Sequence, residues 1–524
     1  MAAPAKLIVI GLDSGDRDLI AQWSAEGHLP TFANLLSEST TGQVGNPHGM
    51  EAGSVWPTFH TGVQPAKHGQ YDGVRVFDPE LYDHRTMRPD EMSPLYFWRH
   101  LKKHGMKACL IDALYMRMPP EDEFDGVILH DWGVHAPSDG GALLDFKTYP
   151  PELAAEVEKK YGLDPLEGQM CDRHNPKTLE QQTWFRDALI ERATKKGEIA
   201  LDQLKKGGWD YFEVAFGDVH CGGHHCWHLH DVTDPEHDPE VLKGLGGNPL
   251  LDIYIATDKA VGKIIEAAGP EAMVFVYCSH GMGAEHSGTR MLDRMLVELE
   301  GEKPRNYRNP VLDVARSAWR AMPKGVRRSL KPMQRKAWNA MMNDGFQPNR
   351  SKRKYFEVYL NNRSAGVRLN VKGRETQGVV ERGAEYEALV DELMKDLLAF
   401  TNVETGEPVV EECVPLIREG EGEFVGTLPD IAVTWNTRHP IRRVTSPKTG
   451  EVVNEKLSVR SGDHRPIGQF YAIGPNFQAR NLNQPVEAVD FSPTFALLLG
   501  LPIPESDGQP IEVLAGSANS VAAE

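Results

Sequence analysis

The sequence predicts an α/β fold in which a mostly parallel central sheet is flanked by helices. Two observations support this prediction. Short, continuous apolar runs, of which LIVIGL at residues 7–12 is the first, are typical of strands that are buried on both faces of a sheet. Longer segments with apolar residues at helical spacing alternate with these runs, and such alternation favours parallel strands connected by crossover helices.

The alternation continues along the whole chain. Further strand-like runs lie at residues 108–112, 211–216, 273–278, 431–435 and 470–473. Helical patterns lie at residues 16–25, 29–36, 152–160, 178–203, 250–267 and 384–400. In open parallel sheets ligands bind just outside the carboxyl ends of the strands. Asp13, which directly follows the first run, is therefore well placed for chemistry.

One basic segment interrupts this pattern. Residues 303–336 hold eleven lysines and arginines and a single acidic residue, Asp313, with apolar residues at roughly helical spacing. A solvated helical insertion is the favoured interpretation; a basic lid over an anionic substrate, or contact with an acidic membrane surface, is the alternative. The predicted organisation is thus the first part of a catalytic core (1–300), a basic helical insertion or lid (301–356), the remainder of the core (357–512) and a flexible tail (513–524).

Composition excludes several classes of protein. The 57 lysine and arginine residues face 75 aspartates and glutamates, for a net charge of −18, which argues against general nucleic-acid binding. No apolar run reaches the roughly 20 residues of a membrane span, and the amino-terminal apolar run resembles a strand rather than a signal peptide. Six cysteines are too few for a disulfide scaffold, so reduced thiols and a cytoplasmic location are expected; the sequence leaves an oligomer open.

Five separated segments place metal-ligating or nucleophilic side chains at predicted strand ends or helix starts. They are GLDSGD around Asp13, SVWPTFHTGVQPAKHG from Ser54, DVHCGGHHCW from Asp218, SHGMG from Ser279, and GDHRPIG around His464. Carboxylates combined with imidazoles suit Zn²⁺, Mn²⁺ or Fe more than Ca²⁺. A single aspartate at a strand end is more often a helix cap, but five such segments together favour a metal site.

The order of these motifs resembles the alkaline phosphatase superfamily and, within it, the type I phosphodiesterase/nucleotide pyrophosphatase group. Two further stretches agree with that group: VRLNVKGRETQGVV followed by LPDIAVTW, and the ending AVDFSPTFALLLGLPIPESDGQPI. The resemblance spans residues 7 to about 512 and covers the basic segment least. It implies an alkaline phosphatase-like fold and hydrolysis of phosphoric esters at one or two divalent ions, with zinc favoured and manganese or iron as alternatives.

The resemblance also implies the residues of the site. One ion would be bound by Asp218, His224 and His464. The other would be bound by Asp13, His280 and a serine or threonine nucleophile.

This sequence departs from the group's pattern at both ion sites. Ser279 stands before His280, where the group usually has an aspartate, so the second site lacks one carboxylate and a single ion is an alternative. Asp218 precedes His224 by six residues instead of the usual four, which makes His220 and His225 alternative ligands. Cys221 and Cys226 nearby are predicted to be buried thiols rather than a separate zinc site, because a second cysteine pair is absent.

The nucleophile position is the third departure. The group's nucleophile usually lies nine residues before the threonine of the Thr-Gly pair, and counting back from Thr61 gives Ala52, which has no hydroxyl. Ser54 is the predicted nucleophile and Thr58 the alternative. Ser54 could instead be only a helix cap, with the nucleophile lost.

The predicted function is hydrolysis of a small anionic phosphoric ester, with a phosphodiester or nucleotide-like substrate favoured. A sulfate-ester or phosphonate hydrolase of the same superfamily is the alternative, although residues 54–57 do not fit the sulfatase pattern, in which Cys or Ser is followed two residues later by Pro. A non-catalytic, metal-stabilised binding protein is the alternative from another class, which Ala52 and Ser279 favour.

Overall fold

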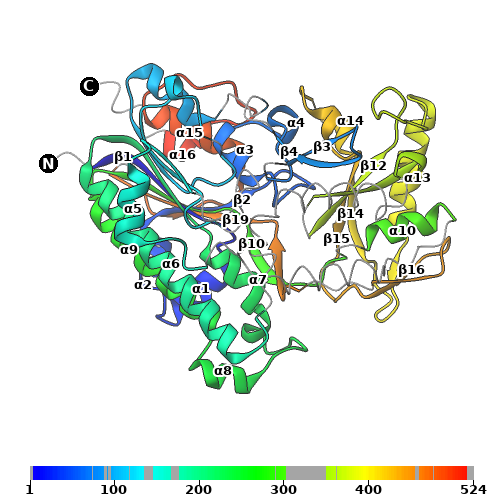
Figure 1. Ribbon diagram of the computed structural model, residues 1–524, viewed down its shortest axis with the longest axis horizontal. Helices are drawn as coiled ribbons and strands as arrows, with labels where there is room; N and C mark the ends of the chain where they lie inside the picture. The colour runs from blue at the N-terminus through cyan, green and yellow to red at the C-terminus, as the bar shows by residue number, and fades with distance from the viewer. Residues whose placement is uncertain are drawn as a thin grey trace, which may run out of the picture.

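The computed structural model describes residues 4–73, 75–87, 91, 96–116, 118–134, 146–166, 176–288, 291–301, 350–360, 363–419, 421–454, 459–475 and 477–515 (Figure 1). The basic segment at residues 303–336 lies outside the described residues. In the described residues no helix is both long and apolar enough to cross a membrane.

The central sheet confirms the predicted fold class. Its strands follow the order β20-β2-β19-β9-β1-β8-β5-β6-β7, and β21 pairs with β2. The pairs among β9, β1, β8, β5 and β6 are parallel, whereas β19 and β7 pair antiparallel with their inner neighbours. The bounds are β1 (Ala5–Leu12), β2 (Thr40–Gly45), β5 (Ala108–Ile111), β6 (Gly126–His130), β7 (Lys147–Tyr149), β8 (Trp209–Phe216), β9 (Met273–Cys278), β19 (Gly468–Ile473), β20 (Arg480–Asn481) and β21 (Val486–Glu487).

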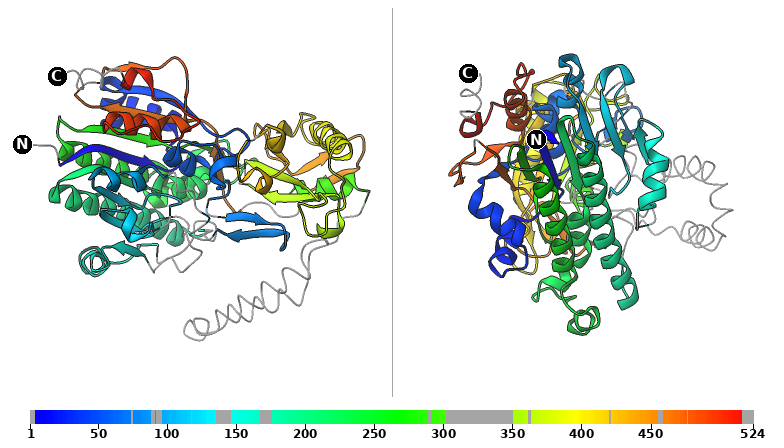
Figure 2. Two further views of the ribbon diagram at one scale, coloured as in Figure 1. Left: turned by 90° about the horizontal axis from the view of Figure 1, so that it is seen from above. Right: turned by 90° about the vertical axis from the view of Figure 1, so that its left-hand side faces the viewer.

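Helices cover both faces of this sheet, as Figure 2 shows most clearly in its left view. One face packs against α1 (Arg17–Ala25), α2 (Pro30–Glu38), α5 (Leu153–Tyr161), α6 (Leu179–Lys206), α7 (Asp218–His230) and α9 (Pro249–Ala268), with α8 (Pro239–Leu245) at their end. The other face packs against α3 (Val55–Thr61), α4 (Pro65–His68), α15 (Phe491–Leu498) and α16 (Glu512–Ala515). Because α16 buries Leu514, the first residues of the expected tail belong to the core.

The side chains of β1 explain why its sequence is continuously apolar. Leu7 and Val9 point into one core, whereas Ile8, Ile10 and Leu12 point into the other. All five are fully buried. Burial of each such side chain stabilises the fold by about 1.5–3 kcal/mol relative to exposure, so a polar residue at any of these positions is costly.

A second unit with its own core lies beside the main sheet (Figure 1). Its antiparallel sheet has the order β11-β12-β15-β14, and a smaller sheet has the order β13-β16-β17. The bounds are β11 (Tyr355–Tyr359), β12 (Ser364–Leu369), β13 (Thr401–Asn402), β14 (Val410–Val414), β15 (Ile431–Trp435), β16 (Arg443–Thr445), β17 (Glu451–Val453), α10 (Leu292–Leu299), α13 (Ala384–Leu398) and α14 (Leu416–Glu419). The stretch expected to be the remainder of the core is thus divided: most of it builds this unit, and the chain rejoins the central sheet at β19.

Two antiparallel pairs of short strands complete the described strands. β3 (Arg75–Asp78) pairs with β4 (Asp83–Thr86), and β10 (Gly281–Ala284) pairs with β18 (Gly462–Arg465). Short 3-10 helices lie at Phe97–His100, Lys102–His104, Glu121–Glu123, Arg350–Lys352, Val425–Thr427 and Ala488–Asp490. The β10–β18 pair connects the central sheet with the second unit.

The register of three parallel strands brings distant segments to one level. Leu12 of β1 pairs with Phe216 of β8 and with Cys278 of β9, and these are the last residues of their strands. The Asp13 amide N–H donates to the Phe216 carbonyl at 2.9 Å, and the Ser279 N–H donates to the Leu12 carbonyl at 3.2 Å. Asp13, the start of α7 and Ser279 therefore meet at the carboxyl edge of the sheet.

A buried histidine packs in the layer opposite α7. His68 is fully buried, its Nδ1 accepts the Gln70 amide N–H at 3.0 Å, and its Nε2–H donates to Thr58 Oγ1 at 3.0 Å. Burial lowers the pKa of His68 to about 3 from its usual 6.5. The folded protein therefore holds this imidazole neutral.

This burial predicts a loss of stability in mild acid. Between pH 6.5 and 3 the unfolded chain binds a proton at His68 that the folded chain excludes, so the contribution of His68 is complete above pH 6.5 and declines as the pH falls. The slope is about 1.4 kcal/mol per pH unit, or about 2 kcal/mol from pH 6.5 to 5. Chemical unfolding of wild type and His68→Gln at these two pH values measures it. An equal loss of unfolding free energy between the two pH values in wild type and His68→Gln contradicts the prediction. His104→Gln, at an exposed histidine, is the control and should behave as wild type.

Candidate metal centre and active site

Three imidazoles converge at the carboxyl edge of the central sheet. His220 and His224 lie four residues apart on α7, which places both on one face of the helix. His464 reaches them from β18. The Nε2 atoms of His220 and His224 are 3.2 Å apart, and that of His464 is 3.1 Å from each of them. Among the described residues this is the group of three whose ligand atoms all lie close enough to hold one ion.

This three-histidine cluster fits a divalent metal ion. Nitrogens in a tetrahedron at about 2.0–2.1 Å from Zn²⁺ are about 3.4 Å apart, close to the distances here, and three histidines are a known catalytic zinc ligand set. The Nδ1–H of His224 donates to the Gly462 carbonyl at 2.7 Å, which leaves the Nε2 lone pair for the ion. Burial and then the neighbouring His280, His224 and His220 hold the pKa of His464 well below its usual value, so its imidazole is neutral.

Glycines allow β18 to approach α7 closely enough to build the cluster. A Cβ atom on Gly462 would lie 2.1 Å from the backbone oxygen of Gly223, and one on Gly223 would lie 2.7 Å from Met282 Cγ. The backbone contact is completed by the Ser461 N–H, which donates to the His224 carbonyl at 2.8 Å. His464 can therefore reach α7 only because these two backbones touch.

Asp13 lies beside the three-histidine cluster and is fixed by two donors. Its Oδ1 accepts the indole N–H of Trp56 at 2.9 Å and the hydroxyl of Ser279 at 3.1 Å. Its Oδ2 is 4.0 Å from His220 Nε2. Burial alone lowers the pKa of His220, but the Asp13 carboxylate and then Cys221 raise it by more, so the net shift is upward. The same negative field favours a metal cation at Nε2.

His280 is held by two serine hydroxyls. Because the Ser279 hydroxyl donates to Asp13, its oxygen accepts the Nδ1–H of His280 at 2.7 Å. The Nε2 of His280 therefore accepts the hydroxyl of Ser14 at 3.0 Å. Burial lowers the pKa of His280 to about 4. Asp13 and His280, the predicted second ligand set, are thus joined through Ser279 where the group usually has a carboxylate.

Asp218 is turned toward a cation of the protein itself. Its Oδ1 accepts the Nε–H of Arg192 on α6 at 2.6 Å, and both side chains are fully buried. Asp164 lies 4.0 Å from the same guanidinium. Asp218 is not among the three residues of the cluster, and among the described residues its buried Oδ2 has no hydrogen-bond partner. The structure therefore brings His220, rather than Asp218, together with His224 and His464.

The remaining predicted site residues have other contacts. Ser54 immediately precedes α3, is fully buried and donates its hydroxyl to the Met50 carbonyl at 2.6 Å, with no side-chain capping bond. Thr58, one turn into α3, contacts His68. The ring of His225 packs against that of Phe185 at 5.3 Å. Cys221 and Cys226 are buried free thiols, as expected.

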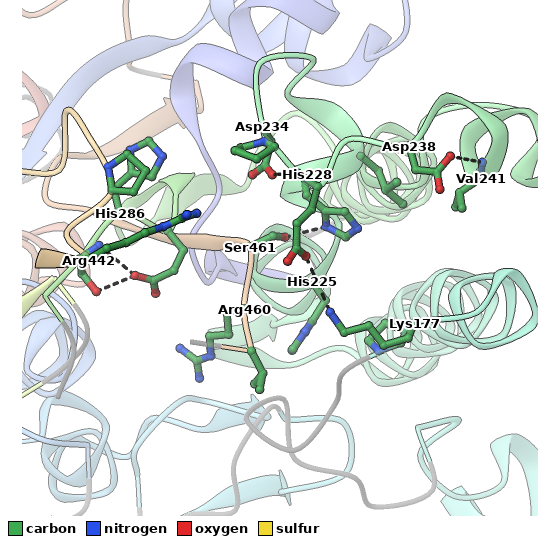
Figure 3. A pocket seen from close by; sticks show the side chains of 18 of the residues that line it. Lys177, His225, His228, Asp234, Asp238, Val241, His286, Arg442, Arg460 and Ser461 are labelled. Atoms are coloured by element: carbon green, nitrogen blue, oxygen red, sulfur yellow. Dashed lines mark hydrogen bonds and ion pairs between the residues drawn. The ribbon is translucent and has the colours of Figure 1, made fainter. Parts of the chain in front are cut away.

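A pocket of about 320 Å³ adjoins the three-histidine cluster (Figure 3). Its lining comes from α7, from the loop between α7 and α8, and from segments of the second unit. Arg460 lines this pocket, and its Nη1 also lies 3.2 Å from His224 Nε2. Arg460 therefore stands between the pocket and the cluster, whose three histidines do not themselves line the pocket.

Sequence reasoning missed four residues of this site. Ser14, Trp56, Arg192 and Arg460 contact Asp13, Asp218 or the histidines. Ser14 and Trp56 stand within two of the motifs above but were not singled out, whereas Arg192 and Arg460 stand in none of them. For His220 the signal was present: its spacing of four residues from His224 is that of the group, whereas the spacing from Asp218 is six.

The close contact between α7 and β18 predicts the effect of a single methyl group. Gly462→Ala places a Cβ against the Gly223 backbone, so β18 must move and His464 is displaced. We expect at least about tenfold weaker Zn²⁺ binding, measured by competition with a chelator. Gly450→Ala, at a glycine with open space around it, is the matched control. Unchanged zinc affinity in a folded Gly462→Ala protein contradicts this role.

Substitution of His220 should change the metal content of the protein, whereas substitution of Asp218 should change its stability. His220→Ala removes one of three ligand nitrogens and should abolish stoichiometric zinc in the purified protein. Asp218→Asn leaves Arg192 as an unpaired buried cation, which costs about 3–5 kcal/mol of stability, while folded molecules keep their zinc. Zinc analysis and chemical unfolding of both variants check this. Loss of zinc from folded Asp218→Asn would instead make Asp218 a ligand.

Comparison with known proteins identifies the family of this chain. A profile of the type I phosphodiesterase / nucleotide pyrophosphatase family matches residues 7–412. No curated protein sequence matches significantly. Among solved structures, murine ectonucleotide pyrophosphatase / phosphodiesterase 5 is 12% identical, with a TM-score of 0.49 over 96% of this chain and 97% of that one. Its inactive variant in complex with AMP is also 12% identical, with a TM-score of 0.50 over 98% and 99%. The second of these structures supports the fold. The profile covers most of the sequence, and the chain belongs to the type I phosphodiesterase / nucleotide pyrophosphatase family.

Proposed function

We propose that this protein is a metal-dependent hydrolase of small phosphodiester or nucleotide-like esters. Hydrolysis of that general kind is what its family supports. The observation that carries the proposal is the convergence of His220, His224 and His464 within 3.2 Å of one another, beside the Asp13 carboxylate. Three imidazole nitrogens directed at one point, next to a negative charge, are an arrangement that a divalent cation stabilises.

The substrate class follows from charge and from the family. A divalent ion at the cluster supplies Lewis-acid chemistry, because it polarises a phosphoryl oxygen and neutralises its charge. Two carboxylates lie beside the cluster: Asp13 is 4.0 Å from His220 Nε2, and Asp463 is 3.9 Å from His464 Nδ1. A divalent ion there would offset both charges, and Arg460 adds a positive charge next to it, so the loaded site favours an anion. The AMP bound to the murine relative motivates a nucleotide-like ester among the substrates to be tested.

The protein's own residues orient the site. Gly462 fixes the ring of His224 through its Nδ1–H, and the two donors from Trp56 and Ser279 hold the Asp13 carboxylate. Fixed rings and carboxylates lower the cost of reorganisation when charge develops on the substrate. The site is also largely closed to water, since Asp13, His220 and His280 are each at most 4% exposed.

Ser54 is the proposed nucleophile. It lies two residues before Trp56, whose indole contacts Asp13, so the start of α3 is anchored at the site. The Ser54 hydroxyl donates to Met50, and attack on phosphorus requires its side chain to rotate away from that carbonyl. Ser14 and Ser279, which contact His280, are the competing hydroxyls.

The nucleophile is tested by removing hydroxyl groups one at a time. Ser54→Ala should lower kcat on bis-p-nitrophenyl phosphate by about 10³-fold or more, because the attacking atom is gone, while zinc content stays unchanged. Ser37→Ala, at an exposed serine that also donates to a backbone carbonyl, is the matched control. Ser14→Ala and Ser279→Ala complete the series.

The outcomes separate the alternatives. Full activity in Ser54→Ala, with loss in one of the other two variants, moves the nucleophile to that serine. If zinc-loaded wild type turns over neither phosphate mono- and diesters nor p-nitrophenyl sulfate, the hydrolase proposal fails. A metal-stabilised binding protein, which Ala52 and the engaged Ser54 favour, is then the better description.

A further inference from the structure

Arg460 lies between the pocket and the three-histidine cluster. Its side chain lines the pocket, together with Lys177 and Arg442 (Figure 3). Its Nη1 is 3.2 Å from His224 Nε2. No feature of the sequence singled out this residue, and the function proposed above assigns it no part.

The backbone that carries Arg460 is fixed to α7. Next to it, the Ser461 N–H donates to the His224 carbonyl at 2.8 Å, and the Gly462 carbonyl accepts the His224 Nδ1–H at 2.7 Å. The Ser461 hydroxyl also contacts His228 Nδ1 at 3.0 Å. Three contacts along two residues therefore hold the Cα of Arg460 in place, so any movement of its guanidinium occurs through side-chain rotation.

Arg460 and a metal ion compete for one lone pair. Because Nδ1 of the neutral His224 carries the proton, Nε2 offers a single lone pair. In this structure an N–H of Arg460 points at that atom. An ion held by His224 uses the same lone pair and repels the positive guanidinium. Ion binding therefore displaces Arg460 from His224, but the fixed backbone keeps the guanidinium beside the ion and at the pocket wall.

Two acidic residues of the pocket are engaged with backbone groups. Asp238 Oδ1 accepts the amide N–H groups of Glu240 and Val241, where it caps α8. Asp234 Oδ1 accepts the N–H of Glu236 at 2.8 Å.

Of the other two acids that line the pocket, Glu285 accepts the Ser287 N–H at 2.9 Å, and Glu236 lies 3.7 Å from Lys177. Each of the four acids thus has a partner of its own, and a displaced Arg460 meets an anion in the pocket more readily than it meets these acids.

We propose that Arg460 is the substrate's anion-binding residue: its guanidinium competes with an ion for Nε2 of His224, and when displaced from that atom it donates hydrogen bonds to the non-bridging oxygens of the phosphoryl group. This inference rests on the function proposed above. Arginine suits the role, because its planar fork of N–H donors matches two phosphoryl oxygens at once.

The proposal predicts opposite effects on two equilibria. Arg460→Ala removes the competitor for His224, so Zn²⁺ should bind more tightly, by about tenfold or more. The same variant removes charge-assisted donors to phosphate, so inorganic phosphate should bind to the zinc-loaded protein about 10–100-fold more weakly. A residue that only supports the metal site would weaken both, which makes the pair of measurements diagnostic.

The experiment compares wild type, Arg460→Ala, Arg460→Lys and the control Arg443→Ala. Arg443 is an exposed arginine on β16 that pairs with Glu451 outside the pocket. Zinc affinity is measured by chelator competition and phosphate affinity by calorimetry on loaded protein. With bis-p-nitrophenyl phosphate, KM should rise in Arg460→Ala, and Arg460→Lys should restore part of the phosphate affinity because it keeps the charge but not the fork. Arg443→Ala should match wild type throughout.

The outcomes distinguish this inference from the proposed function. Unchanged phosphate affinity, or weaker zinc binding, in Arg460→Ala overturns the inference even if wild type hydrolyses esters. If wild type hydrolyses no ester but Arg460→Ala still binds zinc more tightly and phosphate more weakly, the hydrolase proposal fails and the anion-binding role of Arg460 stands. Should Arg460→Ala not fold, Arg460→Lys decides: phosphate affinity equal to wild type contradicts the need for the fork.

Discussion

Direct contact between the backbones of α7 and β18 is the constraint on which the whole site depends. The two segments are 240 residues apart, yet the His224 ring is fixed by the carbonyl of Gly462, two residues before His464. Side chains larger than hydrogen at Gly223 or Gly462 would separate them. The cluster is therefore specified as much by the absence of side chains as by the imidazoles, since a shift of about 1 Å is enough to spoil coordination geometry.

The side chains around the three-histidine cluster leave little negative charge next to it. Asp218 faces Arg192, and the position of a second carboxylate is taken by the hydroxyl of Ser279. Both arrangements reduce the negative charge available to cations. Asp13 and Asp463 are the carboxylates that lie beside the cluster. A divalent ion would offset both charges, and a positive region around it would attract anions through electrostatics before any specific contact forms. Arg460 adds to the same field.

Much of the fold could be predicted from periodicity alone. The continuous apolar run at residues 7–12 reflects a strand that is buried on both faces. The long helical pattern that becomes α6 reflects a helix that is buried on one face. β2, with the sequence TTGQVG, and the β10–β18 pair were not predicted, because small and polar residues give no hydrophobic signal there. The strand at residues 431–435 was predicted correctly but lies in the second unit, since strand propensity does not say which sheet a strand joins.

The residues of the candidate site were likewise only partly predictable from the sequence. Motifs predicted Asp13, His224, His280 and His464 as ligands, and the structure brings His224 and His464 to 3.1 Å of each other and His280 to 3.9 Å of Asp13. The contact of Asp218 with Arg192 had no local signal, since a long-range ion pair depends on how α6 packs against α7. The hydroxyl network of Ser14 and Ser279 likewise depends on the register of β1 against β9, which only the folded sheet defines.

The position of His464 in the chain also sets the order in which the protein matures. During synthesis the strands β1, β8 and β9 emerge first and can pair, but the third imidazole follows only after the whole second unit has left the ribosome. Nascent or prematurely terminated chains carry His220 and His224 alone, a pair that lacks the third donor of the cluster. Capture of an ion by all three imidazoles therefore has to wait until β18 has been synthesised, after the second unit.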